Sequence, residues 1–152
     1  MILIMFLFWN CAISSPFQWK DSIDRNKDID RKVYVGITEV VLGDDSKKND
    51  LFWDYVYKLR KEIHSNNGFL GISIRRQLFQ RKAWTMTVWE SEEDMDNFVY
   101  SGTHKKAMKD AFDAMVSTRF ARVELTFKEI PISWEKAEKF LDERENKKRK
   151  TN

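Results

Sequence analysis

Residues 82–94, with the sequence KAWTMTVWESEED, pass from an alternating pattern straight into the start of a helix. The alternation has the period of two that a β-strand shows, and sizeable side chains point to both faces. One face carries Trp84, Met86 and Val88, and the other carries Thr85, Thr87 and Trp89. Ser91 then provides a helix N-cap, and the acidic residues after it suit the positive end of a helix dipole. The stretch therefore predicts a strand over residues 82–90 followed at once by a helix from Glu92.

The segments on either side of this stretch repeat the same two kinds of element. Val33–Leu42 (VYVGITEVVL) is rich in β-branched residues, as strands are. Apolar residues then recur at three- and four-residue steps, which predicts a helix, and Asn66-Asn67-Gly68 ends it. We predict four strands, over residues 33–42, 69–78, 82–90 and 119–129. We predict three helices, over residues 46–65, 92–115 with an interruption at Ser101-Gly102, and 134–144.

The predicted order of elements is β-α-β-β-α-β with one further helix at the C-terminal end, which is the order of the ferredoxin-like α+β fold. In this fold the helices of the repeat cover one face of the sheet. A sheet with helices on one side only would leave Trp89, Tyr34 and Thr87 exposed, and a second copy packed sheet to sheet would cover them. We therefore expect a homodimer in the form of a dimeric α+β barrel.

The composition is that of one ordinary globular domain. Hydrophobic residues make up 42% of the 152 and charged residues 34%, which argues against a disordered chain. A single Cys excludes a disulfide framework within one chain, and the two His lack an HExxH spacing, so we expect no metal site. We place the ferredoxin-like domain at residues 33–141. An apolar segment and charged linker (1–32) precede it, and a charged tail (142–152) follows it.

The two ends of the chain predict little chemistry. Met1–Trp9 is an apolar run too short to span a bilayer, which needs about 20 apolar residues. We expect a cytoplasmic protein; the alternative is export or lipid anchoring through Cys11, and only then contact with a membrane. The tail 142–152 ends in a basic cluster. No basic stripe interleaved with aromatic residues occurs elsewhere, so we expect no nucleic-acid partner.

The central stretch also carries a resemblance. Residues 84–94 (WTMTVWESEED) and 98–104 (FVYSGTH) resemble the antibiotic-biosynthesis-monooxygenase superfamily of dimeric α+β barrels. Within it the chain is most similar to small bacterial proteins that are distantly similar to spheroidene monooxygenase. Supporting segments are 68–75 (GFLGISIR), 118–122 (TRFAR) and 129–137 (EIPISWEKA). The resemblance covers about residues 33–137 and is more specific for fold than for chemistry.

The resemblance implies a cavity in each subunit between the helices and the sheet. Members of the superfamily include cofactor-independent oxygenases that act on phenolic polycycles, haem-degrading enzymes, haem-bound oxygenases and proteins with no known reaction. We therefore expect a small monooxygenase-like protein that binds a flat hydrophobic or phenolic molecule. The alternatives are a non-catalytic ligand-binding or interaction barrel, or a haem-binding member. In the haem-degrading pattern the iron ligand would fall near Met108 and a characteristic Trp on Phe98, so both signature residues are absent.

His104 is the candidate catalytic residue. It follows Ser101-Gly102-Thr103 at the restart of a helix, and we expect it to lie across from Trp84 or Trp89. A neutral imidazole could deprotonate a phenolic or enolic substrate, or bind haem iron. The alternative is a structural role, in which the ring binds a backbone group or a carboxylate at the helix end.

The neighbours of His104 complete the predicted site. Lys105 and Lys106 would lower its pKa and favour the neutral, basic form. Arg75 and Arg122, on strands predicted to be inner ones, could bind an anionic group of the substrate or pair with Glu124 or Glu39. The predicted lining of the ligand pocket, whose aromatic members could equally be core residues, is Trp84, Trp89, Phe98, Tyr100, Met108, Arg75 and Arg122.

Overall fold

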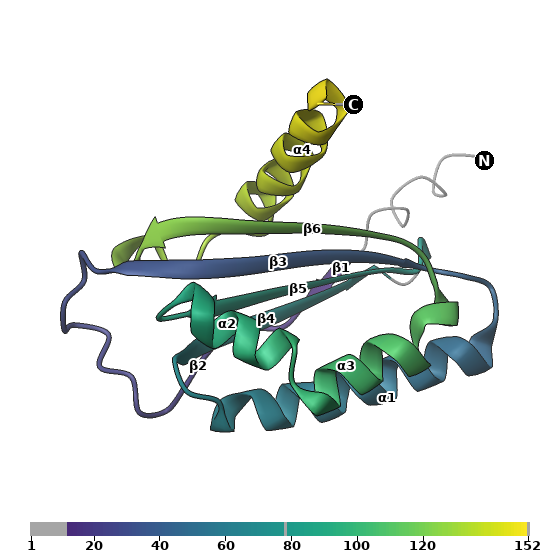
Figure 1. The fold of residues 1–152 in the computed structure, drawn as a ribbon, viewed down its shortest axis with the longest axis horizontal. Coiled ribbons are helices and arrows are strands. Elements are labelled where there is room, and N and C mark those ends of the chain that lie inside the picture. The colour runs from purple at the N-terminus through teal and green to yellow at the C-terminus, as the bar shows by residue number, and fades with distance from the viewer. Residues whose placement is uncertain (1–11, 78, 152) are drawn as a thin grey trace, which may run out of the picture.

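The computed structural model describes residues 12–77 and 79–151 (Figure 1). The apolar run Met1–Trp9 and Cys11 lie outside these residues, and so do the predictions that rest on them. The strands are β1 (Ala12–Ser14), β2 (Gln18–Trp19), β3 (Lys32–Leu42), β4 (Phe69–Gln77), β5 (Lys82–Trp89) and β6 (Met115–Thr126). The helices are α1 (Ser46–Glu62), α2 (Glu92–Val99), α3 (Gly102–Asp110) and α4 (Trp134–Thr151). Short 3₁₀ turns cover Ile63–Ser65, Phe112–Ala114 and Phe127–Glu129.

The strands form one antiparallel sheet in the order β1-β4-β5-β3-β6, and β2 also pairs with β4. The four long strands have the ferredoxin-like arrangement, so the predicted fold class is confirmed. The long central strands β3 and β5 place Tyr34 opposite Trp89 and Glu39 opposite Trp84. Because side chains alternate along each strand, these two pairs project from opposite faces of the sheet.

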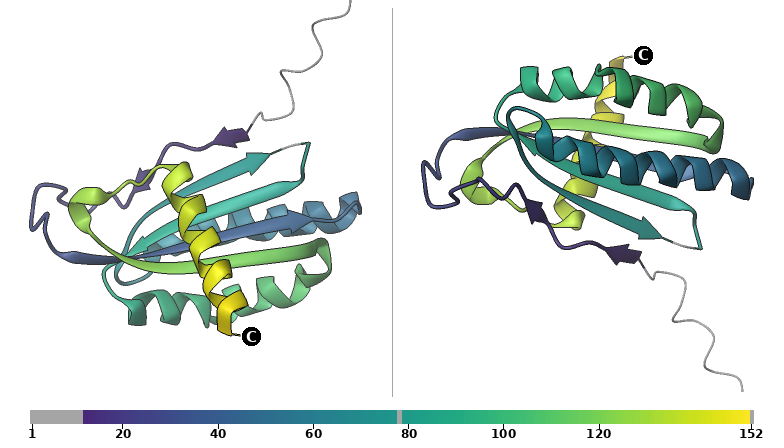
Figure 2. Two further views of the ribbon diagram at one scale, coloured as in Figure 1. Left: turned by 90° about the horizontal axis from the view of Figure 1, so that it is seen from above. Right: turned by 90° about the horizontal axis from the view of Figure 1, so that it is seen from below.

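Helices α1, α2 and α3 lie on one face of the sheet, and α4 crosses the other (Figures 1 and 2). Trp89 points to the first of these faces and is 0% exposed, packed among Phe69, Met95 and Phe98. The prediction that Trp89 would stay exposed without a second copy is therefore wrong, because α2 covers it within the same chain.

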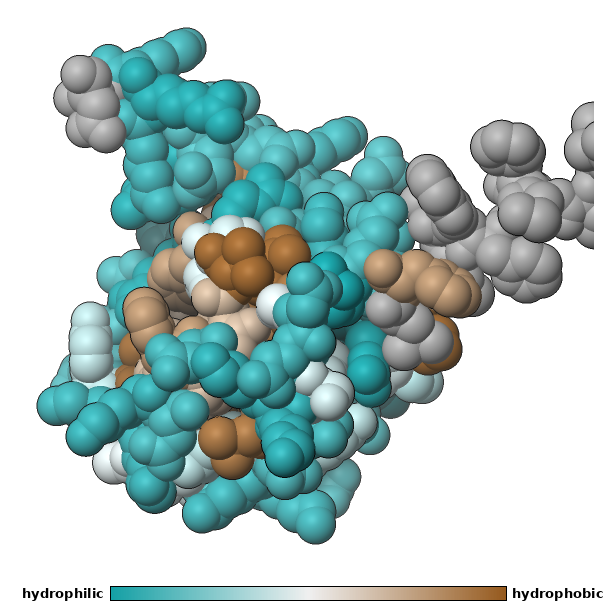
Figure 3. Space-filling view, turned by 90° about the vertical axis from the view of Figure 1, so that its right-hand side faces the viewer, coloured by the Kyte–Doolittle hydropathy of each residue, from teal (hydrophilic) through white to brown (hydrophobic). Residues whose placement is uncertain are grey.

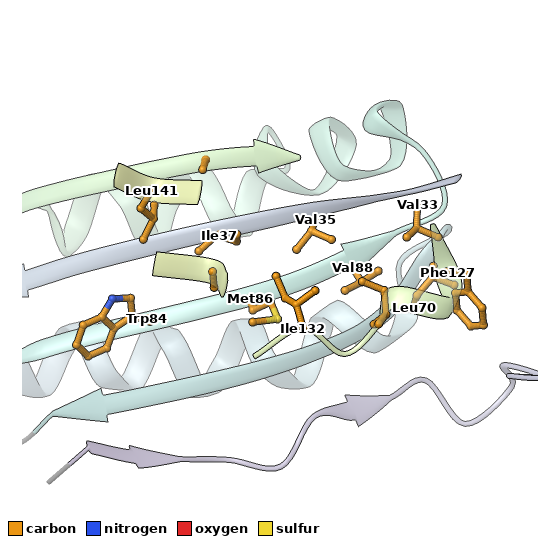
Figure 4. Close-up of a cluster of buried hydrophobic side chains, with 13 residues drawn as sticks. Val33, Val35, Ile37, Leu70, Trp84, Met86, Val88, Phe127, Ile132 and Leu141 are labelled. Carbon is orange, nitrogen blue, oxygen red and sulfur yellow. The ribbon is translucent and has the colours of Figure 1, made fainter. Parts of the chain in front are cut away.

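The face under α4 holds the larger of the apolar layers. Alternate residues of β3 and β5 point into it, among them Val35, Trp84 and Met86 (Figure 4). The chain after β6 closes this layer with Phe127, Ile130, Ile132, Ala137 and Leu141. This is the face that a partner would cover in a sheet-to-sheet dimer, and α4 occupies part of it.

Residues 12–19, which the sequence analysis places ahead of the domain, add an edge to the sheet. Ser14 pairs with Arg75, and Trp19 pairs with Gly71. A Cβ atom on Gly71 would lie 2.4 Å from the ring of Phe17, so only glycine permits this close approach. Phe17 and Trp19 also pack against the apolar layer under α4.

Several element boundaries differ from the prediction; α3, for example, ends at Asp110 instead of continuing to Met115. β6 begins at Met115 instead of Arg119, because β3 offers it pairing partners as far as Leu42. β6 ends at Thr126, where a capping box with Glu129 turns the chain into a 3₁₀ turn. α4 continues to Thr151, well past the predicted end at Arg144. Among the described residues, no helix is both long and apolar enough to cross a membrane.

Candidate functional site

His104 lies in the first turn of α3, and its hydrogen bonds determine which ring nitrogen carries the proton. The Ser101 hydroxyl caps the helix by accepting a bond from the His104 backbone N–H at 3.3 Å. The ring atom Nδ1 lies 3.0 Å from the Val99 carbonyl oxygen. Because a carbonyl can only accept, Nδ1 carries the proton of the neutral ring and Nε2 carries the lone pair. Nε2 has no hydrogen-bond partner within residues 12–77 and 79–151.

The half-buried position of this ring favours its neutral form. Burial lowers the pKa of His104 because the charged imidazolium loses hydration, and the bond to the Val99 carbonyl opposes this only in part. The direction agrees with the prediction, but the cause is burial and not the charge of Lys105 and Lys106. Lys106 is instead paired with Asp110 at 2.6 Å. His104 is therefore a neutral base at pH 7 whose free nitrogen is Nε2.

A column of five packed rings fixes the position of His104. The centroid of its ring lies 5.2 Å from that of Phe98, and Phe98 lies 5.4 Å from Trp89. Trp89 lies 5.4 Å from Phe69, which in turn contacts His64 at 5.1 Å. The structure thus brings three predicted site residues together. Trp89 and Phe98 support the imidazole from beneath, however, and do not line an open pocket.

Two other predicted residues are close to His104 in the sequence and are exposed. Tyr100, between α2 and α3, is 72% exposed, and Met108, one helical turn after His104, is 44% exposed. Phe112, which no pattern in the sequence singled out, begins the 3₁₀ turn that follows α3 and is 67% exposed. We call Tyr100, His104, Met108 and Phe112 the α3 surface. In a view of the end of the molecule where α3 passes into β6, apolar atoms gather at the surface (Figure 3).

Trp84 does not belong to this site. It lies on the α4 face of the sheet, so the expectation that it faces His104 is not met. Its indole N–H donates to the Glu39 carboxylate at 2.8 Å, and Arg119 donates to the same carboxylate twice, each at 2.8 Å. Although burial opposes ionisation, these bonds hold the pKa of Glu39 below its usual range.

The two arginines predicted for the site, Arg75 and Arg122, lie in different parts of the structure. Arg75 lies over the Trp84 ring and pairs with Glu138 of α4 at 2.5 Å, so it helps to hold α4 on the sheet. Arg122 lies on β6, which is an edge strand and not an inner one. It pairs with Asp96 of α2 at 2.5 Å. The predicted pairing of either arginine with Glu39 or Glu124 is therefore wrong.

A polar cluster between α1 and α3 also escaped the sequence analysis. The Tyr55 hydroxyl donates a short hydrogen bond to Asp110, which also pairs with Lys106. The bond to Asp110 raises the pKa of Tyr55, so the phenol stays protonated. Its members are far apart in the sequence, at residues 55 and 106–110, and no local pattern links them. The cluster joins the two helices and leaves α3 with a fixed orientation.

The side chains around His104 do not fit the haem-degrading pattern. Met108 and Phe98 stand where that pattern has a histidine and a tryptophan, and Phe98 is packed between two rings. Two hollows of about 530 and 50 Å³ are lined by other parts of the chain. No group of three or more His, Cys, Asp or Glu that could hold a metal occurs in the described part of the chain. We derive no step through haem.

The fold is shared with solved bacterial structures. "Putative antibiotic biosynthesis monooxygenase" from Nitrosomonas europaea is 12% identical, with a TM-score of 0.52 over 62% of this chain and 88% of that one. A "putative monooxygenase" from Fusobacterium nucleatum is 13% identical, with a TM-score of 0.56 over 72% and 47%. Another from Lactobacillus acidophilus is 17% identical, with a TM-score of 0.50 over 64% and 48%. The chain thus spans about half the length of the last two, and at such identities the likeness shows the fold alone.

This likeness defines the class of fold: a ferredoxin-like α+β fold that the chain shares with structures named as putative monooxygenases. The particular family follows from a family model described as a domain of unknown function, DUF3291. It matches residues 40–127, more than half of the chain, and the chain belongs to this family. A comparison with curated proteins finds no match.

The state of His104 can be checked by NMR. We expect its Nδ1 to be protonated and Nε2 unprotonated at pH 7, and its pKa to lie below the ordinary value of about 6.5. Since the folded pKa is the lower one, this residue stabilises the fold above the ordinary pKa and ceases to do so as the pH falls through the folded pKa. Long-range ¹H–¹⁵N spectra over a pH titration measure both properties. A ring protonated at Nε2, or a pKa at or above the ordinary value, would contradict the assignment.

Proposed function

We propose that the protein is a small monooxygenase-like enzyme in which His104 acts as the base on a flat hydrophobic or phenolic substrate bound at the α3 surface. One observation carries the proposal: the half-buried imidazole is neutral, its Nε2 has no partner in the described part of the chain, and exposed aromatic and thioether side chains are close to it in the sequence. A weak carbon or oxygen acid placed against these side chains would bring its proton within reach of that nitrogen.

The chemistry needs only the substrate, His104 and molecular oxygen. Nε2 removes a proton from an activated CH₂ group, and the resulting carbanion, delocalised into the phenolic rings, transfers an electron to oxygen. Formation of a C–O bond and cleavage of the O–O bond convert the CH₂ group into a carbonyl and release water. The Val99 carbonyl stabilises the imidazolium that forms, since it accepts a hydrogen bond from Nδ1–H throughout.

The side chains of the α3 surface suit such a substrate. Tyr100 and Phe112 offer aromatic faces, and the flexible thioether of Met108 adapts to irregular apolar outlines. Phe98 beneath the imidazole keeps the ring from turning away. The substrate would be held mainly by apolar contact, with His104 as the polar group that orients it.

A turnover experiment tests the role of His104. We expect the protein to accelerate oxygen uptake by 1,8-dihydroxyanthrone above its rate in buffer, because its CH₂ group is acidified by the adjacent rings. His104→Gln removes the base and should lower the rate by about 10²–10⁴-fold. His64→Gln, at the far end of the ring column, is the matched control and should keep the wild-type rate.

The same experiment separates the enzyme from its main alternative. If the wild-type protein binds the anthrone but does not exceed the buffer rate, the non-catalytic binding barrel is the better description. If His104→Gln turns over at the wild-type rate, another group is the base. Circular dichroism of each variant establishes that the fold is retained.

We also propose that the protein is a homodimer located in the cytoplasm and that it is related to small bacterial proteins distantly similar to spheroidene monooxygenase. Support for the dimer comes from β6, a long edge strand whose outer backbone groups are free to pair and whose Phe120 side chain is 37% exposed. Light scattering at micromolar concentration should then give twice the chain mass of 18.2 kDa. A monomer mass would contradict it.

A further inference from the structure

The hollow of about 530 Å³ lies on the opposite side of the sheet from His104. The chain between β2 and β3 loops out beyond one end of the sheet (Figure 1) and meets the turn that follows β6. Between them is a pocket of about 530 Å³, a size typical of small-molecule sites. It is lined by Trp19, Ile23, Asp24, Arg25, Asn26, Phe127, Lys128, Ile130 and Pro131.

The inner wall of this pocket is apolar and aromatic. Trp19 packs edge to face against Phe127 with ring centroids 5.2 Å apart. Phe127 and Ile130 are buried, while Trp19 and Ile23 are half-buried, so each of the latter two keeps a part of its side chain free. Such a wall favours a flat apolar molecule.

Hydrogen bonds hold the wall in place. The Arg31 guanidinium lies 3.6 Å from the centre of the Phe127 ring and donates to the carbonyl oxygens of Lys27 and Asp28. Arg31 also pairs with Glu90 at 3.2 Å. The loop is therefore tied to the sheet end, and backbone bonds from Phe127 to Arg31 and from Lys128 to Ile29 close the ring around the pocket. A pocket formed before binding loses little affinity to ordering.

The rim of the pocket carries more positive than negative charge. Lys128 and Arg25 are cations, and Asp24 is the one carboxylate among the lining residues. Lys128 is paired with Asp30 at 2.5 Å, and the Asp24 carboxylate accepts a bond from the Asn26 backbone at 3.0 Å. Arg25 makes no ion pair in the described part of the chain, so its planar guanidinium is available to a ligand.

From this arrangement we infer that the pocket binds a planar aromatic anion, with its rings against Trp19 and its negative group on Arg25. The inference does not depend on the proposed function, because none of these residues belongs to the α3 surface. It also gives a role to residues between 19 and 26, which supply one wall of the pocket ahead of the matched family region.

The test uses two probes that differ only in charge. The anion is 1-anilinonaphthalene-8-sulfonate, and the neutral analogue is N-phenyl-1-naphthylamine; binding of each to the full chain is followed by fluorescence titration. Arg25→Gln should weaken the sulfonate probe about tenfold and leave the neutral probe unchanged, because only the sulfonate uses the guanidinium. Asn26→Trp, which fills the rim with a bulky side chain, should abolish binding of both.

Two controls make the result specific to this pocket. Arg144→Gln removes an exposed arginine of α4 and should leave both affinities unchanged. Met108→Gln alters the α3 surface, so it reveals any probe that binds there, and the Arg25-dependent difference between the two probes should remain. The inference is overturned if Arg25→Gln affects the two probes equally or not at all, or if Met108→Gln and not Asn26→Trp abolishes binding.

Discussion

The structure depends on a sheet that is buried on both faces. Along β5 the alternation sends Trp84 to one side and Trp89 to the other, and both indoles are almost completely buried. Each indole N–H must then find an acceptor, which is Glu39 for Trp84 and Thr87 for Trp89. Helices α1–α3 bury the side chains on one face of this strand, and helix α4 buries those on the other. The α3 surface lies on the face that α1–α3 cover, and the residues that line the pocket of about 530 Å³ belong to the face under α4.

The packing on the α1–α3 face of the sheet sets the position, the pKa and the tautomer of the His104 ring. A fully buried Trp89 supports Phe98, and Phe98 supports the imidazole, so the ring has a rigid base. The same packing excludes water from part of the ring and lowers its pKa, while the Val99 carbonyl fixes its tautomer. Under the proposed function, the residues that would line a pocket if they were loosely packed instead support a base at the surface.

Local patterns predicted most of the fold, and three of the residues predicted for the site, Trp89, Phe98 and His104, pack together in the structure. The alternation in β3 and β5 and the caps at Ser91 and Gly68 act over a few residues, and they gave the correct elements. Local patterns do not predict which elements pack over each face of the sheet. The expectation of an exposed Trp89 failed because α2 returns over it. Of the two tryptophans expected across from His104, only Trp89 lies on its side of the sheet, as the strand period that separates them requires. The edge strands at residues 12–19 are short and depend on close packing at Gly71, which no periodicity reveals.

The central claim is that the ligand binds beside His104, on the face of the sheet that α1–α3 cover. Amide chemical-shift mapping with 1,8-dihydroxyanthraquinone, the ketone that anthrone oxidation yields, tests it most directly. The account predicts that the largest shifts occur at Tyr100, His104 and Met108. Shifts confined to residues 19–26 and 127–131, or no shifts at all, would contradict it.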